Sequence, residues 1–231
     1  MPQTNAQPTS LSLSNKHIIV SRAGIAGLAV IIALSHSWPL DVAPPHITLY
    51  ERREKAISPD REGYTISICS DRMSGGMLAL QQLDLLDEVL EASVLRSEGG
   101  KGGFHLWDRD FRPILRFRTP EKPPNGLPVH GDRIARYLLR QCLIDALPES
   151  CEVRWGTSCE TAERLEDGRM RVLFSGGRSG ECDLLVAADG ANSKTRAALR
   201  LKDVLKHAGV SMIAASARFE DDVPDDIKES F

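Results

Sequence analysis

The pattern of apolar and polar positions near the amino terminus predicts a strand, a helix and a second strand in succession. The short apolar run at residues 18–20 lies between polar residues, as in a buried strand. After a tight turn, the alanine-rich apolar stretch at 24–34 predicts a buried helix. Residues 35–45 contain three prolines and predict a loop, and 46–51 predict the second strand. This order predicts a βαβ unit.

Farther along the chain, the pattern predicts a mixture of helices and short strands. Residues 77–94 carry apolar side chains at helical spacing, whereas the runs 104–107 and 114–117 predict a hairpin. Asp132 is expected to be the N-cap of a helix that extends to about Leu147. Its predicted buried stripe is Ile134, Tyr137, Leu138 and Cys142. The other expected strands are 63–68, a β-meander at 151–155, 161–165, 170–174 and 182–188, and a last strand at 209–219.

The turn between the first strand and the helix carries two of the three glycines of a dinucleotide-binding fingerprint. In G-x-G-x-x-G, the first glycine makes the tight turn, the second lets the backbone approach a pyrophosphate, and the third lets the helix pack close to the sheet. Gly24 and Gly27 fill the second and third places, and Arg22 stands at the first. A residue with a Cβ is costly in that turn, and its side chain either crowds the phosphate or pairs with it.

An acidic residue follows this turn at the spacing of a ribose-binding carboxylate. Glu51 ends the second predicted strand, 24 positions after Gly27. In dinucleotide folds, an acid about 20 residues after the glycines accepts hydrogen bonds from the adenosine ribose hydroxyls. The alternative is an ordinary βαβ unit with an exposed glutamate at a strand end. The order of strand, turn, helix, strand and acid favours the dinucleotide fold.

Composition limits the class of protein. The 231 residues, 42% of them hydrophobic, suffice for one large domain or for one domain with a subdomain. The net charge of −3 and the sparse aromatic residues give no indication of a nucleic-acid partner. The apolar stretch 24–34 is too short to span a bilayer, so no membrane anchor is expected.

The remaining features of the composition point to a reduced protein without a metal. The five cysteines show no C-x-x-C spacing, so reduced thiols are expected, and the six histidines form no metal-ligand cluster. Residues 1–15 are polar and lack the regions of a signal peptide. They predict a disordered tail, and a cytoplasmic location is the expectation that follows.

Three further segments place the fingerprint in a larger pattern. They are Arg61-Glu-Gly63, Val129-His-Gly-Asp-Arg-Ile134, and Asp183-Leu-Leu-Val-Ala-Ala-Asp-Gly-Ala-Asn-Ser193 with Arg196 beyond it. Together with the fingerprint, this order resembles the flavin-dependent aromatic hydroxylases, the group A FAD monooxygenases of the para-hydroxybenzoate hydroxylase type. The resemblance covers about residues 16–201, and the Asp-Gly segment is its most specific part.

The resemblance implies a fold and a set of cofactor contacts. The fold is α/β, with a Rossmann-like FAD-binding domain over residues 16–231, a β-meander and a partial second sheet, of which about 104–128 would be a remnant of the family's substrate sheet. Gly24 and Gly27 would line the pyrophosphate, and Glu51 would hold the ribose. The implied cofactor-binding residues are Ala23, Gly24, Gly27, Glu51, Arg52, Arg61, Gly63, Arg133, Asp189 and Gly190.

Two of these assignments have simpler alternatives. Arg61 and Gly63 match the family's Arg-x-Gly, which faces the pyrophosphate and the flavin edge, and a guanidinium pairs well with phosphate oxygens. The alternative for Arg61 is a solvated loop cation. Asp189 and Gly190 match the family's Asp-Gly motif, near the pyrophosphate and the path of NADPH. The alternative for Asp189 is an N-cap or turn residue without a ligand.

The sequence also departs from the family pattern. Arg22 replaces the first glycine, and Ala187 replaces a small glycine. The family's Val-x-Arg-x-x-Leu at a helix start, laid on Val129, puts Gly131 in the place of the arginine, with Arg133 two positions later. The family continues into a second Gly-Asp motif, which would lie beyond Phe231. From these departures we expect the binding of FAD to be weak or lost.

The resemblance implies an FAD-dependent monooxygenase that acts on a small aromatic or polyketide-like substrate, with NADPH as the reductant. A partner chain that supplies the missing half of the family fold would then be needed for hydroxylation. The alternatives are a catalytically degenerate pseudoenzyme, a cofactor-independent cyclase or isomerase on the same fold, and a binding partner of another enzyme.

Overall fold

The structure, a computed structural model, describes most of the first of two units into which the chain divides. The units are Met1–Leu201 and Lys202–Phe231. The described residues are 13–55, 65–70, 75–93, 103–110, 112–118, 123, 126–129, 131–200 and 206–210. The second unit contributes only residues 206–210, so the fold below is that of the first.

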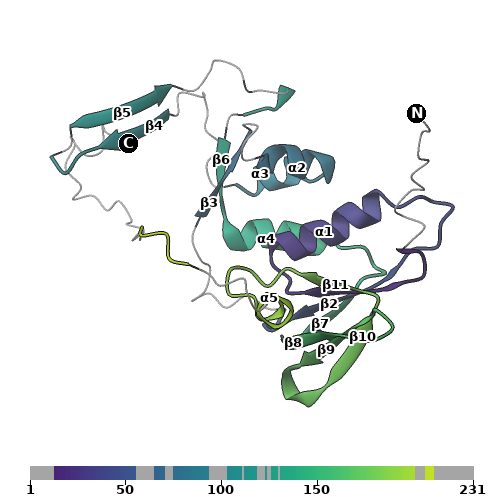
Figure 1. The fold of residues 1–231 in the computed structure, drawn as a ribbon. Helices are drawn as coiled ribbons and strands as arrows, with labels where there is room; N and C mark the ends of the chain where they lie inside the picture. Colours follow the sequence, from purple (N-terminus) through teal and green to yellow (C-terminus); the bar gives the residue numbers. More distant parts are fainter. Residues whose placement is uncertain are drawn as a thin grey trace, which may run out of the picture. The chain divides into compact units, whose positions relative to one another are not determined.

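A parallel sheet of four strands lies at the centre of this unit (Figure 1). Its strands are β1 (His17–Ser21), β2 (His46–Glu51), β7 (Glu152–Trp155) and β11 (Leu184–Ala187), in the order β11-β1-β2-β7. Ile19 of β1 lies opposite Leu185 on one side and Thr48 on the other. The helix α1 (Ile25–His36) connects β1 to β2. The prediction of a Rossmann-like α/β fold is confirmed.

Strand β1 is buried on both faces, which explains its uninterrupted apolar run. Ile18 and Val20 belong to a large core that includes α1 and α4 (Arg136–Asp145), two helices that lie side by side in Figure 1. Ile19 belongs to a second core on the opposite face. Because burial of one such side chain stabilises a protein by about 1.5–3 kcal/mol, β1 is a major contributor to stability.

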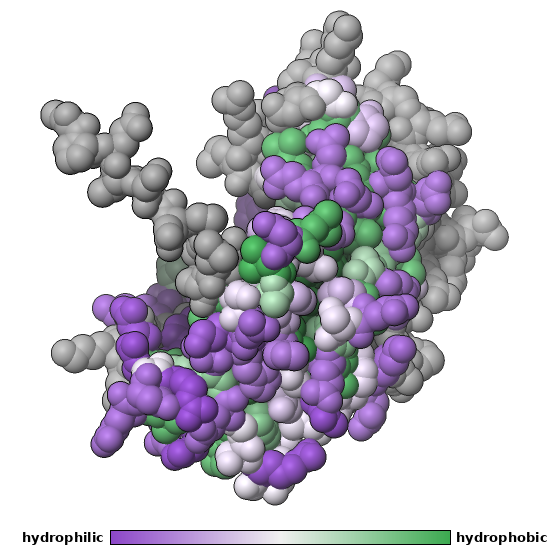
Figure 2. Space-filling view, turned by 90° about the vertical axis from the view of Figure 1, so that its right-hand side faces the viewer, coloured by the Kyte–Doolittle hydropathy of each residue, from purple (hydrophilic) through white to green (hydrophobic). Residues whose placement is uncertain are grey.

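An antiparallel meander covers the second face. It consists of β8 (Cys159–Arg164), β9 (Met170–Phe174) and β10 (Ser179–Cys182), in the order β10-β9-β8. The rings of Tyr50 and Phe174 stack, with centroids 4.0 Å apart. Figure 2 shows that hydrophilic side chains are dense in the lower part of that view, where the meander lies. Exposed ion pairs such as that of Arg171 with Glu181 account for part of this density.

Two of the four strands predicted for the meander lie elsewhere. The prediction was wrong for 151–155, because β7 is the edge strand of the parallel sheet, paired with β2. The single strand predicted at 182–188 is divided between β10 in the meander and β11 in the parallel sheet. The division falls at Asp183, whose N–H donates to the His17 carbonyl (2.9 Å) and whose carboxylate accepts the His17 N–H (2.8 Å).

The single helix predicted at 77–94 is two helices, α2 (Gly76–Gln82) and α3 (Leu86–Glu91). Between them Asp84 has φ 55, in the left-handed region, while Leu83 and Leu85 are both buried. On a continuous helix, residues two apart face different directions. The turn at Asp84 therefore lets both leucines reach the core.

The prediction that Asp132 caps a helix was wrong. Asp132 lies in β6 (Gly131–Ala135), which pairs antiparallel with β3 (Thr65–Cys69), and the helix α4 begins only at Arg136. Asp132 is buried and accepts a hydrogen bond of 2.6 Å from the Ser93 hydroxyl. The buried residues of α4 are Leu139, Cys142, Leu143 and Ile144. Of the predicted stripe, Ile134 is buried in β6 and Cys142 in α4, whereas Tyr137 and Leu138 are only half-buried.

The predicted hairpin is confirmed as β4 (Gly103–Trp107) and β5 (Pro113–Arg118), which form a two-stranded sheet of their own. Residues 1–12 of the tail expected at 1–15, and most of the last predicted strand at 209–219, lie outside the described residues. Among the helices that the structure describes, none is long and apolar enough to cross a membrane.

Candidate functional site

The carboxyl ends of β1, β2 and β11 meet at one edge of the parallel sheet. The chain passes from β1 to β2 on one side, while β11 occupies the other side of β1. The strand order therefore changes direction at β1. In open α/β sheets, ligands bind in the crevice at such a point, outside the carboxyl ends of the strands.

The turn after β1 adopts the conformation of a fingerprint turn although it lacks the first glycine. Arg22 has φ 81, and its N–H donates to the Tyr50 carbonyl at 2.7 Å. The left-handed region costs a residue with a Cβ about 1–2 kcal/mol. A Cβ on Gly27 would lie closer than 3.0 Å to the Arg22 carbonyl oxygen, whereas a Cβ on Gly24 would meet nothing within 4 Å. Gly27 therefore serves packing, and Gly24 leaves open space beside the helix start.

Glu51 binds the backbone of this turn. Its side chain is only 4% exposed, so the alternative of an exposed glutamate at a strand end is wrong. One carboxylate oxygen accepts the Ala23 N–H at 2.9 Å, and the other accepts the Arg53 N–H at 3.0 Å. The carboxylate thus fixes the turn after β1 to the end of β2.

Arg140 of α4 reaches the same turn from the other side. Its Nε donates to the Ala23 carbonyl at 2.7 Å, so Glu51 and Arg140 hold the two backbone polar groups of Ala23. The guanidinium lies 5.6 Å from the centroid of the Trp155 ring. Its Nη2 lies 4.0 Å from a Glu51 oxygen, and this buried nitrogen has no hydrogen-bond partner.

The surroundings of Arg140 carry an excess of positive charge. Burial lowers the pKa of its guanidinium; Glu51 opposes this shift, and the cations Arg136, Arg53 and Arg22 reinforce it. The charges that act on Arg140 are thus three guanidinium groups against one carboxylate. Such an arrangement is favourable for an anion.

Arg22 links the turn after β1 to the turn after β11. Its Nη1 donates to the Asp189 carbonyl at 2.7 Å, and a Cβ on Gly190, which has φ 85, would lie 3.3 Å from the same nitrogen. One Asp189 carboxylate oxygen accepts the Thr195 N–H in the first turn of α5 (Lys194–Leu199) at 3.3 Å. The other oxygen is buried without a partner.

A pocket of about 410 Å³ opens at this edge of the sheet. Its volume falls in the range of about 300–1,000 Å³ that is typical of ligand pockets. Its lining includes three cationic side chains, of which Lys194 also pairs with Glu160. The lining residues are Ser21, Arg22, Tyr50, Arg52, Ser158, Cys159, Asp189, Ala191, Asn192 and Lys194.

Most of the residues predicted to bind a cofactor come together at this edge. Ala23, Gly24, Gly27 and Glu51 lie at the turn after β1, and Arg52, Asp189 and Gly190 lie at or next to the pocket. Arg133 does not join them, because it is exposed on strand β6. Arg61 and Gly63 lie outside the described residues. No group of three histidine, cysteine or acidic side chains in the described part could hold a metal ion.

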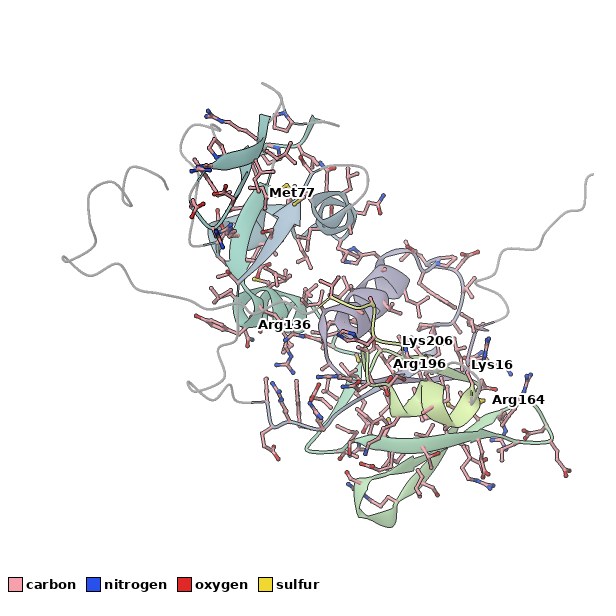
Figure 3. The ribbon with its side chains drawn as sticks, turned by 60° about the vertical axis from the view of Figure 1, so that its left-hand side comes forward. Lys16, Met77, Arg136, Arg164, Arg196 and Lys206 are labelled. Atoms are coloured by element: carbon pink, nitrogen blue, oxygen red, sulfur yellow. The ribbon has the colours of Figure 1, made fainter. Side chains whose placement is uncertain are left out.

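Two arginines at this edge were missed in the sequence. Arg136, labelled in Figure 3, is the first residue of α4. The buried Ile134 lies two positions before it, and the buried Leu139 lies three positions after it. The pattern Val-x-Arg-x-x-Leu therefore fits Ile134, Arg136 and Leu139, and a search for buried apolar positions around each arginine would have found it. Arg140 gave no such signal, because its partner Ala23 is 117 positions away.

Three cysteine thiols predict how the free energy of unfolding depends on pH. Burial raises the pKa of Cys159 from 9.0 to about 12, and the pKa values of Cys151 and Cys182 to about 11. The folded state thus favours the neutral thiols. The contribution of these neutral thiols to the free energy of unfolding is complete below about pH 9 and is lost as the pH rises towards about 12. We expect the free energy of unfolding in urea to fall over this range.

The matched variant for this measurement is Cys159→Ala. It removes the thiol with the largest shift, so its unfolding free energy should fall less steeply with pH than that of the parent chain. Equal slopes for the two proteins would contradict a buried, neutral Cys159.

Comparison with known proteins gives consistent results. No family model matches the chain. The chain is 37% identical over 227 residues to a protein named monooxygenase cfoF from Aspergillus candidus, covering 95% of this chain and 54% of that protein. It is 30% identical over 188 residues to a probable FAD-dependent monooxygenase from Arthroderma benhamiae, covering 79% of this chain and 38% of that protein.

Solved structures agree with these relatives. A putative FAD-containing monooxygenase from Photorhabdus luminescens is 28% identical, with a TM-score of 0.56 over 79% of this chain and 41% of that one. The chain belongs to the FAD-dependent monooxygenase family. A 2-methyl-3-hydroxypyridine-5-carboxylic acid oxygenase, 22% identical with a TM-score of 0.58, shares the fold over 80% of this chain and 42% of that one. The chain of this monooxygenase family spans about half the length of the first of these two relatives and less than half of the second.

Proposed function

We propose that this chain binds the adenosine diphosphate half of FAD at the edge formed by β1, β2 and β11. It would do so within a flavin-dependent monooxygenase that acts on a small aromatic or polyketide-like molecule, with NADPH as the reductant. The substrate class and the reductant come from the family resemblance alone.

The observation that carries the proposal is the excess of cationic groups beside the start of α1. Burial and the cations Arg136 and Arg53 lower the pKa of Arg140, and Glu51 is the carboxylate that opposes them. A diphosphate carries negative charge that would balance these groups. The buried Nη2 of Arg140 has no partner, which leaves a donor for an anionic oxygen.

The helix start fits a phosphate as well. α1 is 12 residues long, and no side chain caps its first turn. The N–H groups at a helix N-terminus and the helix dipole together favour bound phosphate. A Cβ on Gly24 would meet nothing within 4 Å, so there is space for a ligand against the backbone. The residues present therefore fit the diphosphate of FAD.

Glu51 is suited to the ribose. Each of its oxygens accepts one backbone N–H. An ionised carboxylate has about four acceptor sites, so two remain for ribose hydroxyls. The same carboxylate would thus shape the turn and bind the sugar.

The residues of the pocket would position the other parts of the reaction. Asp189 and Gly190, tied to Arg22, would organise the backbone near the diphosphate and the path of NADPH. Bound FAD supplies the redox and oxygen chemistry, and the residues of this chain bind and orient it.

We expect the chain to bind FAD weakly and the variant Arg22→Gly to bind it about tenfold more tightly. Glycine adopts φ 81 without the cost of a Cβ, and it removes the guanidinium that spans the crevice to the Asp189 carbonyl. Titration calorimetry with FAD measures both affinities.

Arg22→Ala is the control, because it removes the guanidinium and keeps the Cβ. It should fall between the parent chain and Arg22→Gly. Failure of both the parent chain and Arg22→Gly to bind FAD or ADP would overturn the proposed function.

A further inference from the structure

Arg140 connects three segments at the carboxyl end of the parallel sheet. From α4 it reaches the Ala23 carbonyl in the turn after β1, the Glu51 carboxylate at the end of β2 and the Trp155 ring at the end of β7. In the sheet, Glu51 lies directly opposite Trp155. The guanidinium therefore lies where three chain segments meet.

The hydrogen bonding of Arg140 is incomplete. Its Nε has a good partner at 2.7 Å, but its Nη2 is 4.0 Å from Glu51, beyond the range of a direct hydrogen bond. A buried donor without a partner is rare in proteins and is costly. The side chain as a whole is 13% exposed, whereas the Nη2 atom itself is buried.

The charges that act on Arg140 are also unbalanced, with more cationic than anionic groups. Arg136, Arg53 and Arg22 repel the guanidinium, and burial disfavours its charge. Only Glu51 among these neighbours attracts it. One anionic oxygen in the crevice, between Arg140 and Glu51, would accept the missing hydrogen bond. It would also offset the repulsion from the other arginines.

We propose that Arg140 is a cofactor-binding residue that contacts the diphosphate of the adenine dinucleotide. It would act as a pair with Glu51, with the arginine taking the anionic oxygens and the glutamate the ribose. This inference rests on the proposed function and adds a residue that neither the fingerprint nor the family pattern indicated. Arg140 would also compensate for the turn glycine that Arg22 replaces, since it holds Ala23 and supplies charge.

A purely structural role for Arg140 makes different predictions. A residue that only held Ala23 in place would affect every ligand of the crevice alike, whether charged or neutral. A residue that contacts the diphosphate affects ADP and FAD but not adenosine. It also makes binding sensitive to salt, because the interaction is between charges.

The experiment compares the parent chain with Arg140→Gln and Arg140→Lys by titration calorimetry with ADP, FAD and adenosine. Glutamine keeps a donor for the Ala23 carbonyl and removes the charge. We expect Arg140→Gln to bind ADP and FAD at least about tenfold more weakly, with adenosine unchanged and a weaker dependence of ADP binding on salt. Arg140→Lys keeps the charge and should retain part of the affinity.

Arg171→Gln is the matched control, because it removes an arginine from an exposed ion pair on β9. It should bind all three ligands as the parent chain does. Equal losses for ADP and adenosine, or no loss in Arg140→Gln, would overturn this inference while leaving the proposed function intact. If Arg140→Gln does not fold, the same comparison of ADP with adenosine in Arg140→Lys decides the question. A parent chain that binds neither ADP nor FAD would overturn the inference together with the proposed function.

Discussion

Glu51→Ala is expected to lower the free energy of unfolding by about 3–5 kcal/mol, the range for breaking a buried ion pair by removal of one partner. The substitution leaves the N–H groups of Ala23 and Arg53 without acceptors. It also leaves Arg140 as a buried cation among three other arginines. Urea unfolding, followed by circular dichroism, measures the loss.

The contacts change the expectation that the sequence alone supports. A ribose-binding acid at a strand end would affect ligand binding and leave the melting temperature nearly unchanged. The buried Glu51 should affect both. Glu152→Ala is the control, because it removes an exposed acid that pairs with Arg154 on β7. Such surface pairs contribute about 0–1 kcal/mol. A loss in Glu51→Ala as small as that of Glu152→Ala would show that the turn does not depend on the carboxylate.

Gly27→Ala is expected to lower the free energy of unfolding by about 3 kcal/mol, at the upper end of the usual cost of overpacking. The new methyl group would lie closer than 3.0 Å to the Arg22 carbonyl oxygen and within 3.4 Å of the Val20 and Ala188 side chains. A main-chain oxygen cannot rotate away as a side chain does, so α1 must move from β1. Chemical unfolding and FAD titration should both detect the change.

Gly24→Ala is the matched variant for this test. The added methyl group meets nothing within 4 Å, and φ −85 is an ordinary backbone angle, so stability should be nearly unchanged. FAD binding should nevertheless weaken, because the methyl group occupies the space beside the helix start. Similar stabilities of Gly24→Ala and Gly27→Ala would contradict the packing described here.

The sequence was most informative where the signals are local. The βαβ unit was predicted within one or two residues, because β1, α1 and β2 are consecutive and each carries its own periodicity. Gly27 and Glu51 were found from spacing alone. The strand β6 was missed, because a short apolar pattern fits a helix and a strand almost equally well. The division at Asp84 was missed, because no glycine or proline marks that turn.

The other errors came from pairings between distant segments. β7 was assigned to the meander because it precedes β8 along the chain, yet its partner is β2, about 100 positions earlier. The contacts of Arg140 and of Arg22 with distant backbone carbonyls are likewise not encoded in any local pattern. The sequence therefore brought most of the predicted residues to one edge of the sheet, and only the packing revealed which charged groups meet there.

The position of β11 has a consequence for how the protein folds during synthesis. β11 is paired with β1, and the paired residues Ile18 and Leu184 are 166 positions apart. While the ribosome makes the intervening segments, β1 has no neighbour on the β11 side. Long-range parallel pairing forms slowly, and an unpaired strand edge promotes association with other chains. The nascent chain thus carries an exposed, apolar β1 edge until β11 has been made, so chaperone capture at this stage should determine the yield of folded protein.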